Sequence, residues 1–177
     1  MVFCKKMNDI MAKTSIFYGS ETGTTADIAR RIAKELGVSD ADIHDVADTA
    51  PDRLGDYDLL ILGSSTWGAG EVAGGWYDFL AGASALDLTR KQIALFGCGD
   101  ESMCDTFCNA VGEIYDAMQG TGADFIGRFN AEGYDFTESR AECDGSFVGL
   151  VLDEVNHPEI TDARIKAWCD EIRRQTA

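Results

Sequence analysis

The chain has 177 residues, which is the usual length of one domain with a sizeable core. Hydrophobic residues make up 45% and charged residues 26%, so a mainly disordered chain is not expected. The formal net charge of −16 repels nucleic acid phosphates and anionic lipid surfaces, which argues against nucleic acid binding and membrane docking. No apolar run approaches the roughly 20 residues of a membrane-spanning helix.

The negative charge is concentrated in one part of the chain. The segment from Gly97 to Asp162 holds 15 Asp and Glu residues, and its only basic residues are Arg128 and Arg140. Such an acidic surface can serve solubility alone, or it can steer positively charged partners into rapid encounters. The charge count leaves both interpretations open.

Six cysteines could form disulfides, but a chain of this size is stable without them, and no secretory signal precedes it. We therefore predict reduced, mostly buried cysteines and a cytoplasmic protein. No C-x-x-C pair occurs, and only His44 and His157 could add imidazole ligands, so we expect no metal site. Residues 1–12 lack an apolar core and are predicted to be a disordered tail before one domain over residues 13–177.

Strands and helices alternate along that domain. Strands are predicted over residues 15–18, 43–46, 57–63, 92–97, 124–128 and 147–152, and helices over 24–36, 76–80, 104–118 and from Thr161 onward. We expect Gly37 to end the first helix and Thr161 to cap the last one. The alternation is typical of a parallel sheet covered by helices on both faces. The polar stretch from Phe129 to Ser146 predicts an insertion late in the chain.

In such folds, ligands bind beyond the carboxyl ends of the strands. The loop after the first strand opens directly into a helix and is rich in hydroxyl groups. Its residues are Ser20, Glu21, Thr22, Gly23, Thr24 and Thr25. Hydroxyls and the free N–H groups of a helix N-terminus can hold a phosphate, although an ordinary helix cap would have the same residues. The loop lacks the lysine of a nucleotide-triphosphate loop and the glycines of a dinucleotide loop, so a phosphate monoester fits best, with Glu21 turned to solvent.

The loops after the third and fourth strands could flank a flat ligand. The third-strand loop contains Ser65, Thr66, Trp67, Gly68, Ala69 and Gly70, and the fourth-strand loop contains Cys98, Gly99 and Asp100. Trp67 can stack on a ring, Gly68 permits backbone conformations closed to other residues, and Asp100 could accept a hydrogen bond from a heterocyclic N–H. Each loop alone is also compatible with a structural role. Together, at one edge of one sheet, the three loops predict a site for a flat ring that carries a phosphate.

Over about nine-tenths of its length, the chain resembles the long-chain flavodoxins. GSETGTT resembles the family loop for the phosphate of flavin mononucleotide (FMN), and YDLLILGSSTWGAGE resembles the strand and loop that carry the inner aromatic ring, here Trp67. FGCGDES and FCNAVG resemble the segment at the pyrimidine edge of the flavin, and NAEGYDFTESRAECDGSFVGLVLDE resembles the long-chain insertion. The resemblance implies an α/β fold with a doubly wound, five-stranded parallel sheet in the order 2-1-3-4-5, helices on both faces and an insertion in the last strand.

The resemblance also implies a function. It implies non-covalently bound FMN and a low-potential one-electron carrier without substrate turnover of its own, which cycles mainly between semiquinone and hydroquinone. The Gly68–Ala69 peptide is implied to lie near N5 of the flavin. The implied partners of this expected monomer are basic-surfaced redox proteins, such as an NADPH-dependent flavodoxin reductase or other low-potential donors and acceptors. We expect them to dock on an acidic face around Glu71, Asp100, Glu101 and Asp153–Glu154.

One residue departs from the family pattern. Flavodoxins usually place a Tyr on the outer face of the flavin, a few residues after the position of Asp100. Here we expect Met103, rather than Cys104, in that place. A thioether contact with an aromatic ring contributes about 0.3–1.5 kcal/mol. Because one of the two stacking rings is missing, we predict a hydroquinone couple that is less negative than in relatives with both rings.

Two other functions are compatible with this fold class. An FMN-dependent NAD(P)H or quinone oxidoreductase would need a nicotinamide or quinone pocket, and no basic cluster for a nicotinamide phosphate is visible near these loops. A phospho-receiver domain would need an Asp at the end of the third strand, where this chain has Gly63 and Ser64. Rapid oxidation of NADPH by the protein alone would favour the first alternative, and a colourless protein would favour the second.

Overall fold

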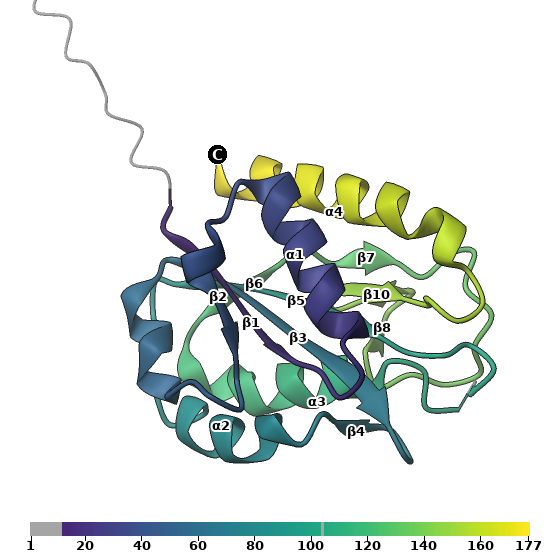
Figure 1. The fold of residues 1–177 in the computed structure, drawn as a ribbon, viewed down its shortest axis with the longest axis horizontal. Helices are drawn as coiled ribbons and strands as arrows, with labels where there is room; N and C mark the ends of the chain where they lie inside the picture. Colours follow the sequence, from purple (N-terminus) through teal and green to yellow (C-terminus); the bar gives the residue numbers. More distant parts are fainter. Residues whose placement is uncertain (1–11, 104) are drawn as a thin grey trace, which may run out of the picture.

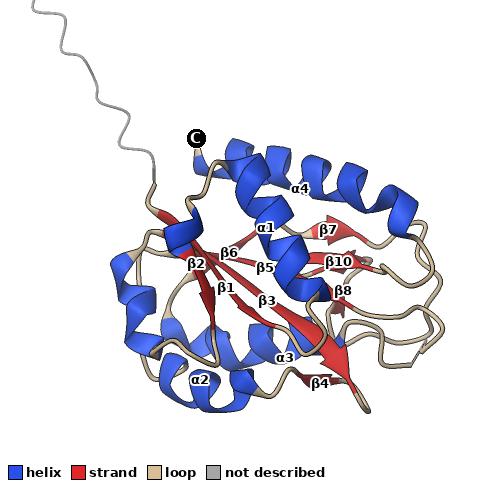
Figure 2. Ribbon diagram, viewed as in Figure 1, coloured by secondary structure: helices blue, strands red, loops and turns tan. Residues whose placement is uncertain are grey.

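The computed structural model describes residues 12–103 and 105–177 (Figure 1). The predicted tail therefore lies outside the described residues, apart from Ala12, and so does Cys104. The described part forms a mostly parallel sheet between two layers of helices (Figure 2). Within it, no helix has both the length and the apolar character that crossing a membrane requires.

Five strand positions make up the central sheet. They are filled by β2 (Ile43–Asp45), β1 (Thr14–Gly19), β3 (Leu59–Trp67), β5 (Gln92–Cys98) and an edge shared by β6 (Asp124–Ile126) and β10 (Leu150–Leu152). All these strands run parallel. The order confirms the predicted doubly wound sheet. Its middle strands are apolar because both of their faces are covered.

The edge position is split between two segments of the chain. β6 pairs with Gln92–Ala94 of β5, and β10 pairs with Phe96–Cys98 further along the same strand. Between them lies the insertion (residues 127–149), with a small antiparallel sheet made of β7 (Phe129–Asn130), β9 (Ser146–Phe147) and β8 (Glu142–Cys143). The structure thus confirms an insertion in the last strand.

The prediction of one strand over residues 147–152 is wrong. Phe147 belongs to the small sheet, whereas Leu150 begins the strand in the central sheet. Two contacts separate them: the Val148 N–H donates to the Ala141 carbonyl, and Gly149 packs so closely on the Leu95 backbone that a Cβ would lie 2.2 Å from its carbonyl oxygen. The chain therefore changes sheets at these two residues.

Two helices cover each face of the central sheet (Figure 1). On one face lie α1 (Thr24–Leu36) and α4 (Thr161–Thr176), and on the other α2 (Gly75–Ala83) and α3 (Asn109–Met118). The remaining elements are the short strand β4 (Glu71–Val72) and the 3₁₀ turns η1 (Asp40–Asp42), η2 (Pro51–Asp56), η3 (Gln119–Thr121) and η4 (Pro158–Ile160).

Three predicted helix ends can be compared with the structure. Gly37 ends α1 in a left-handed conformation, with φ of 73°, as predicted. The predicted start of α3 at Cys104 is wrong, because Cys108 has φ of 52° and the helix begins only after it. The prediction that Thr161 caps α4 is also wrong: Ile160 occupies the cap position, and the buried Thr161 hydroxyl has no hydrogen-bond partner in the described part of the chain.

Candidate functional site

The carboxyl ends of β1, β3 and β5 lie side by side, since Gly19 pairs with Ser64 and Ser65 pairs with Cys98. A cavity of about 370 Å³ opens there. Its lining residues are Thr22, Thr24, Ser65, Thr66, Trp67, Cys98, Gly99, Asp100, Glu154 and Val155. The three predicted loops therefore meet at one site, whose volume lies within the roughly 300–1,000 Å³ of small-molecule sites.

The loop after β1 presents unpaired N–H groups. Gly23 precedes α1 with φ of 94°, and its own N–H donates to the Ser20 Oγ (3.0 Å). In the described residues, the N–H groups of Thr24, Thr25 and Ala26 donate to no protein acceptor. These donors, together with the positive end of the helix dipole, could hold an anion without a basic side chain.

Four of the six loop residues do not line the cavity, namely Ser20, Glu21, Gly23 and Thr25. The buried Thr25 directs its hydroxyl to the Cys98 Sγ (3.8 Å). Glu21 is exposed, as expected, but its carboxylate is not free in solvent, because Oε1 accepts a hydrogen bond from the Gly74 N–H (2.8 Å). Glu21 therefore ties the loop to the start of α2.

Trp67 belongs to a strand and not to a loop. The predicted end of this strand at Gly63 is wrong: β3 continues because Thr66 and Trp67 pair with β4 in an antiparallel hairpin. The indole Nε1 of Trp67 donates to the Ser65 Oγ (2.8 Å), and the residue is 40% exposed. The ring is thus fixed in orientation and accessible at the cavity.

A second cavity of about 110 Å³ adjoins the first one. It is lined by Thr66, Trp67, Gly68, Asp100, Met103 and Thr106. Met103 therefore lies in the same cavity as Trp67, and 52% of its surface is exposed. Gly68 has φ of 53° in the turn of the hairpin, whereas Ala69 and Gly70 line neither of these cavities.

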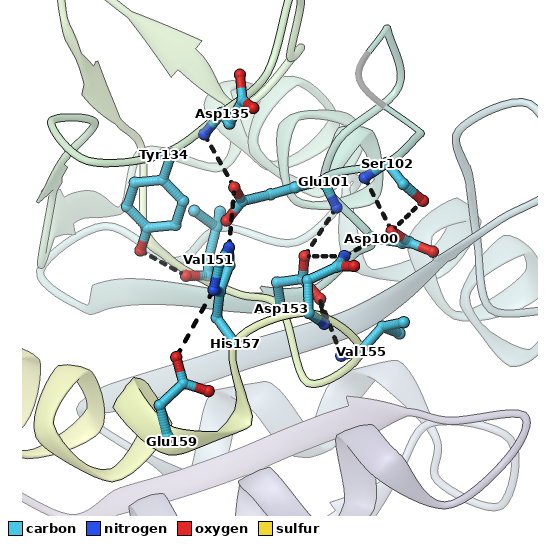
Figure 3. Close-up of polar contacts among 11 residues, drawn as sticks. Asp100, Glu101, Ser102, Tyr134, Asp135, Val151, Asp153, Val155, His157 and Glu159 are labelled. Carbon is cyan, nitrogen blue, oxygen red and sulfur yellow. Dashed lines mark hydrogen bonds and ion pairs between the residues drawn. The ribbon is translucent and has the colours of Figure 1, made fainter.

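Hydrogen-bond donors surround the carboxyl group of Asp100 (Figure 3). Its Oδ1 accepts hydrogen bonds from the Ser102 Oγ (2.5 Å), the Asn156 Nδ2 (2.9 Å) and the Ser102 N–H (2.9 Å). These donors lower the pKa of Asp100 below its ordinary value, because they stabilise the charged form. A carboxylate at the cavity can accept a hydrogen bond from a ring N–H of a ligand.

The loop after β10 was predicted only as part of a docking face, not of the ligand site. Glu154 and Val155 line the cavity, and Asn156 binds Asp100. The signal was present, because this loop also follows the carboxyl end of a parallel strand. The expected docking face needs a correction as well: Asp153 is 1% exposed and Glu101 is 7% exposed, so neither can contribute to a surface.

Most of the described cysteines are free, buried thiols. They are Cys98, Cys108 and Cys169, whereas Cys143 is exposed. Burial raises the pKa of Cys98 to about 12 and that of Cys108 well above its ordinary value. The prediction of mostly buried cysteines is confirmed for Cys98, Cys108 and Cys169, whereas their reduced state stays a prediction. Cys4 and Cys104 lie outside the described residues.

The arrangement could hold a flat ring that carries a phosphate. Comparisons with known proteins show the family of the chain. The family model "Flavodoxin" matches residues 16–168. The flavodoxin of Haemophilus influenzae is 42% identical over 164 residues, which are 92% of this chain and 94% of that protein. Flavodoxin 1 of Escherichia coli is 42% identical over 167 residues, 93% of this chain and 95% of that protein.

A solved structure is similar over nearly the same range. It is the Fusobacterium nucleatum flavodoxin bound to FMN, with a TM-score of 0.85 and 30% identity over 93% of this chain and 99% of that one. The chain therefore belongs to the flavodoxin family. Flavodoxins are electron carriers rather than enzymes that turn over a substrate of their own, which confirms the predicted class of protein.

The hydrogen bond between Asn156 and Asp100 predicts a pH effect. Because the pKa of Asp100 is lowered in the folded protein, the carboxylate stabilises the fold above the ordinary pKa of aspartate, and this stabilisation is lost as the pH falls through the lowered value. Asn156→Ala removes one donor and should raise the pKa of Asp100. Carboxyl NMR titration measures this pKa, with Gln119→Ala on an exposed residue as the control. If the pKa of Asp100 is unchanged in Asn156→Ala, the hydrogen bond from Asn156 does not contribute to lowering it.

Proposed function

We propose that the protein binds FMN non-covalently in the 370 Å³ cavity and transfers single electrons on it at low potential, cycling mainly between semiquinone and hydroquinone. One observation carries the proposal: an anion site at the start of α1, an exposed Trp67 ring and the Asp100 carboxylate open onto the same cavity. The similarity to a flavodoxin that is bound to FMN supports it. FMN supplies the redox chemistry, and the protein supplies binding, orientation and electrostatics.

Sixteen residues are proposed to form the cofactor site. They are Ser20, Glu21, Thr22, Gly23, Thr24, Thr25, Ser65, Thr66, Trp67, Gly68, Ala69, Gly70, Cys98, Gly99, Asp100 and Met103. The loop after β1 holds the phosphate with backbone N–H groups and hydroxyls. Trp67 and Met103 pack against the ring, and Asp100 accepts a hydrogen bond from a ring N–H. Ser20, Glu21 and Thr25 act indirectly, since their hydrogen bonds shape the phosphate loop.

Two features of the site are proposed to tune the redox potentials. Gly68 lies at the turn of the hairpin, where the absence of a Cβ lets the Gly68–Ala69 peptide reorient and accept a hydrogen bond from a reduced ring N–H. The surrounding carboxylates oppose additional negative charge on the ring. One carboxylate at about 10 Å and an effective dielectric near 20 contributes roughly 1.7 kcal/mol, or about 70 mV for one electron.

We infer that the partners are redox proteins with basic surfaces, such as an NADPH-dependent flavodoxin reductase or other low-potential donors and acceptors. The acidic residues with accessible surface at or beside the cavities, Glu71, Asp100 and Glu154, support this inference. Opposite charge raises the rate of encounter, and salt weakens the effect. We expect the protein to act as a monomer in the cytoplasm.

Binding of FMN and riboflavin tests the proposed phosphate site. Riboflavin has the same ring but no phosphate, so it cannot accept hydrogen bonds from the start of α1. We expect FMN-free protein to bind riboflavin at least about 100-fold more weakly than FMN, since hydrogen bonds to a charged group contribute about 1.5–3 kcal/mol each. Quenching of flavin fluorescence measures both affinities. Equal affinities, or no binding of either flavin, would contradict the proposal.

Met103→Tyr tests whether the residue on the outer face of the flavin tunes its potential. A second stacking ring disfavours the electron-rich hydroquinone, so the semiquinone/hydroquinone potential should fall by about 20–60 mV. Spectroelectrochemistry measures the potential. The control is Tyr77→Met, the reverse change at a residue that is also 52% exposed but lines neither cavity of the site. If the potential stays the same or rises in Met103→Tyr, stacking at this position does not determine the semiquinone/hydroquinone potential.

A further inference from the structure

The side chain of Glu101 is buried behind the loop that carries Asp100. Only 6% of this side chain is exposed, although its neighbour Asp100 lines the cavity. Burial of a carboxylate is unfavourable unless hydrogen bonds compensate for the lost water. The Oε2 of Glu101 accepts a hydrogen bond from the Asp135 N–H (2.9 Å) and lies 3.7 Å from the His157 Nε2 (Figure 3). The Oε1 has no hydrogen-bond partner among the described residues.

The donor of this hydrogen bond lies in the insertion, on a segment that is itself fixed. The hydroxyl of Tyr134 donates to the Val151 carbonyl in β10 (2.7 Å). Its ring packs 5.0 Å from the ring of Phe147 and lies 3.8 Å below the guanidinium of Arg164 in α4. Asp135 therefore presents its N–H from a segment anchored to both the central sheet and a helix.

The main chain of Glu101 is held from another direction. Its N–H donates to the Oδ2 of the buried Asp153, after the end of β10 (2.9 Å). The Asp153 carboxylate also accepts the N–H groups of Val155 and Asn156 (2.9 and 2.8 Å), and Asn156 in turn binds Asp100. The loop of residues 99–103 is thus clamped at Glu101 by its backbone and its side chain together.

We propose that Glu101 is a positioning residue through which the insertion holds the loop of residues 99–103, and with it Asp100 and Met103, in the geometry that binds FMN. The inference rests on the proposed FMN site and assigns a role to the insertion, none of whose residues lines the cavities that contain Asp100. A loop ordered in advance binds its ligand more tightly, because less order has to be imposed on binding. By linkage, FMN bound at the loop must in turn stabilise the Glu101–Asp135 contact.

Three variants separate this role from general effects of charge and stability. Glu101→Ala removes the acceptor of the Asp135 N–H, whereas Glu101→Gln keeps an oxygen in its place. Glu138→Gln is the control, since it removes the same charge from an exposed insertion residue whose side chain makes no hydrogen bond within the described residues. We expect the Kd for FMN to rise about tenfold in Glu101→Ala, by less than about threefold in Glu101→Gln, and not in Glu138→Gln.

Amide hydrogen exchange supplies a readout that does not depend on electron transfer. In the unsubstituted protein, FMN should slow exchange of the Asp135 N–H, and in Glu101→Ala this effect should disappear. If the unsubstituted protein binds no FMN, the proposed function and this inference both fail. If it binds FMN while Asp135 exchange is unaffected and Glu101→Ala binds equally well, the inference alone fails. If Glu101→Ala does not fold, two measurements test the inference instead: the Kd of Glu101→Gln for FMN, and the effect of FMN on exchange of the Asp135 N–H in the unsubstituted protein.

Discussion

The in-register parallel pairing of β1, β3 and β5 determines where the site can form. These strands end at the same edge of the sheet, with Gly19 beside Ser64 and Ser65 beside Cys98. The loops that follow the three strands therefore lie next to one another. Close packing on this sheet depends on glycine: a Cβ at Gly63 would lie 2.1 Å from the ring of Phe96. The sheet therefore sets the position of the cavity, and glycine allows the core beneath it to pack closely.

The proposed phosphate site lies in a chain whose net charge of −16 repels anions. The free N–H groups at the start of α1 attract an anion without a basic side chain. In the proposed function, the loop holds one phosphate while the outer surface stays acidic and attracts basic partners. In the proposed function, the same acidity opposes a further negative charge on a reduced ring, so one surface property would serve both partner recognition and a low potential.

The sequence predicted best what depends on local pattern. The bounds of α1 agree with the prediction, because an apolar stripe at helical spacing ends at a glycine. The start of α3 could not be predicted in this way, since it depends on the left-handed Cys108. The separation of β9 and β10 depends on contacts outside both strands, with Ala141 and with Leu95, which is distant in sequence.

At the site, too, local pattern could be predicted from the sequence and contacts between distant segments could not. Trp67, Asp100 and the hydroxyl loop were found from their places after predicted strands, and the structure brings them to one cavity. The burial of Glu101 and Asp153 was not predictable, because acidic residues are ordinarily exposed and part of what compensates for burial here is hydrogen bonding between distant segments. Their contacts join three loops that the sequence analysis treated as separate.

The most direct test of the central claim is an anaerobic reductive titration of the purified protein with bound FMN, followed by visible absorbance. The account predicts a yellow protein that passes through a stable blue neutral semiquinone before it bleaches to the hydroquinone. A yellow protein that goes directly to the hydroquinone would contradict the one-electron role and favour two-electron enzyme chemistry. A protein that holds no flavin would contradict the site itself.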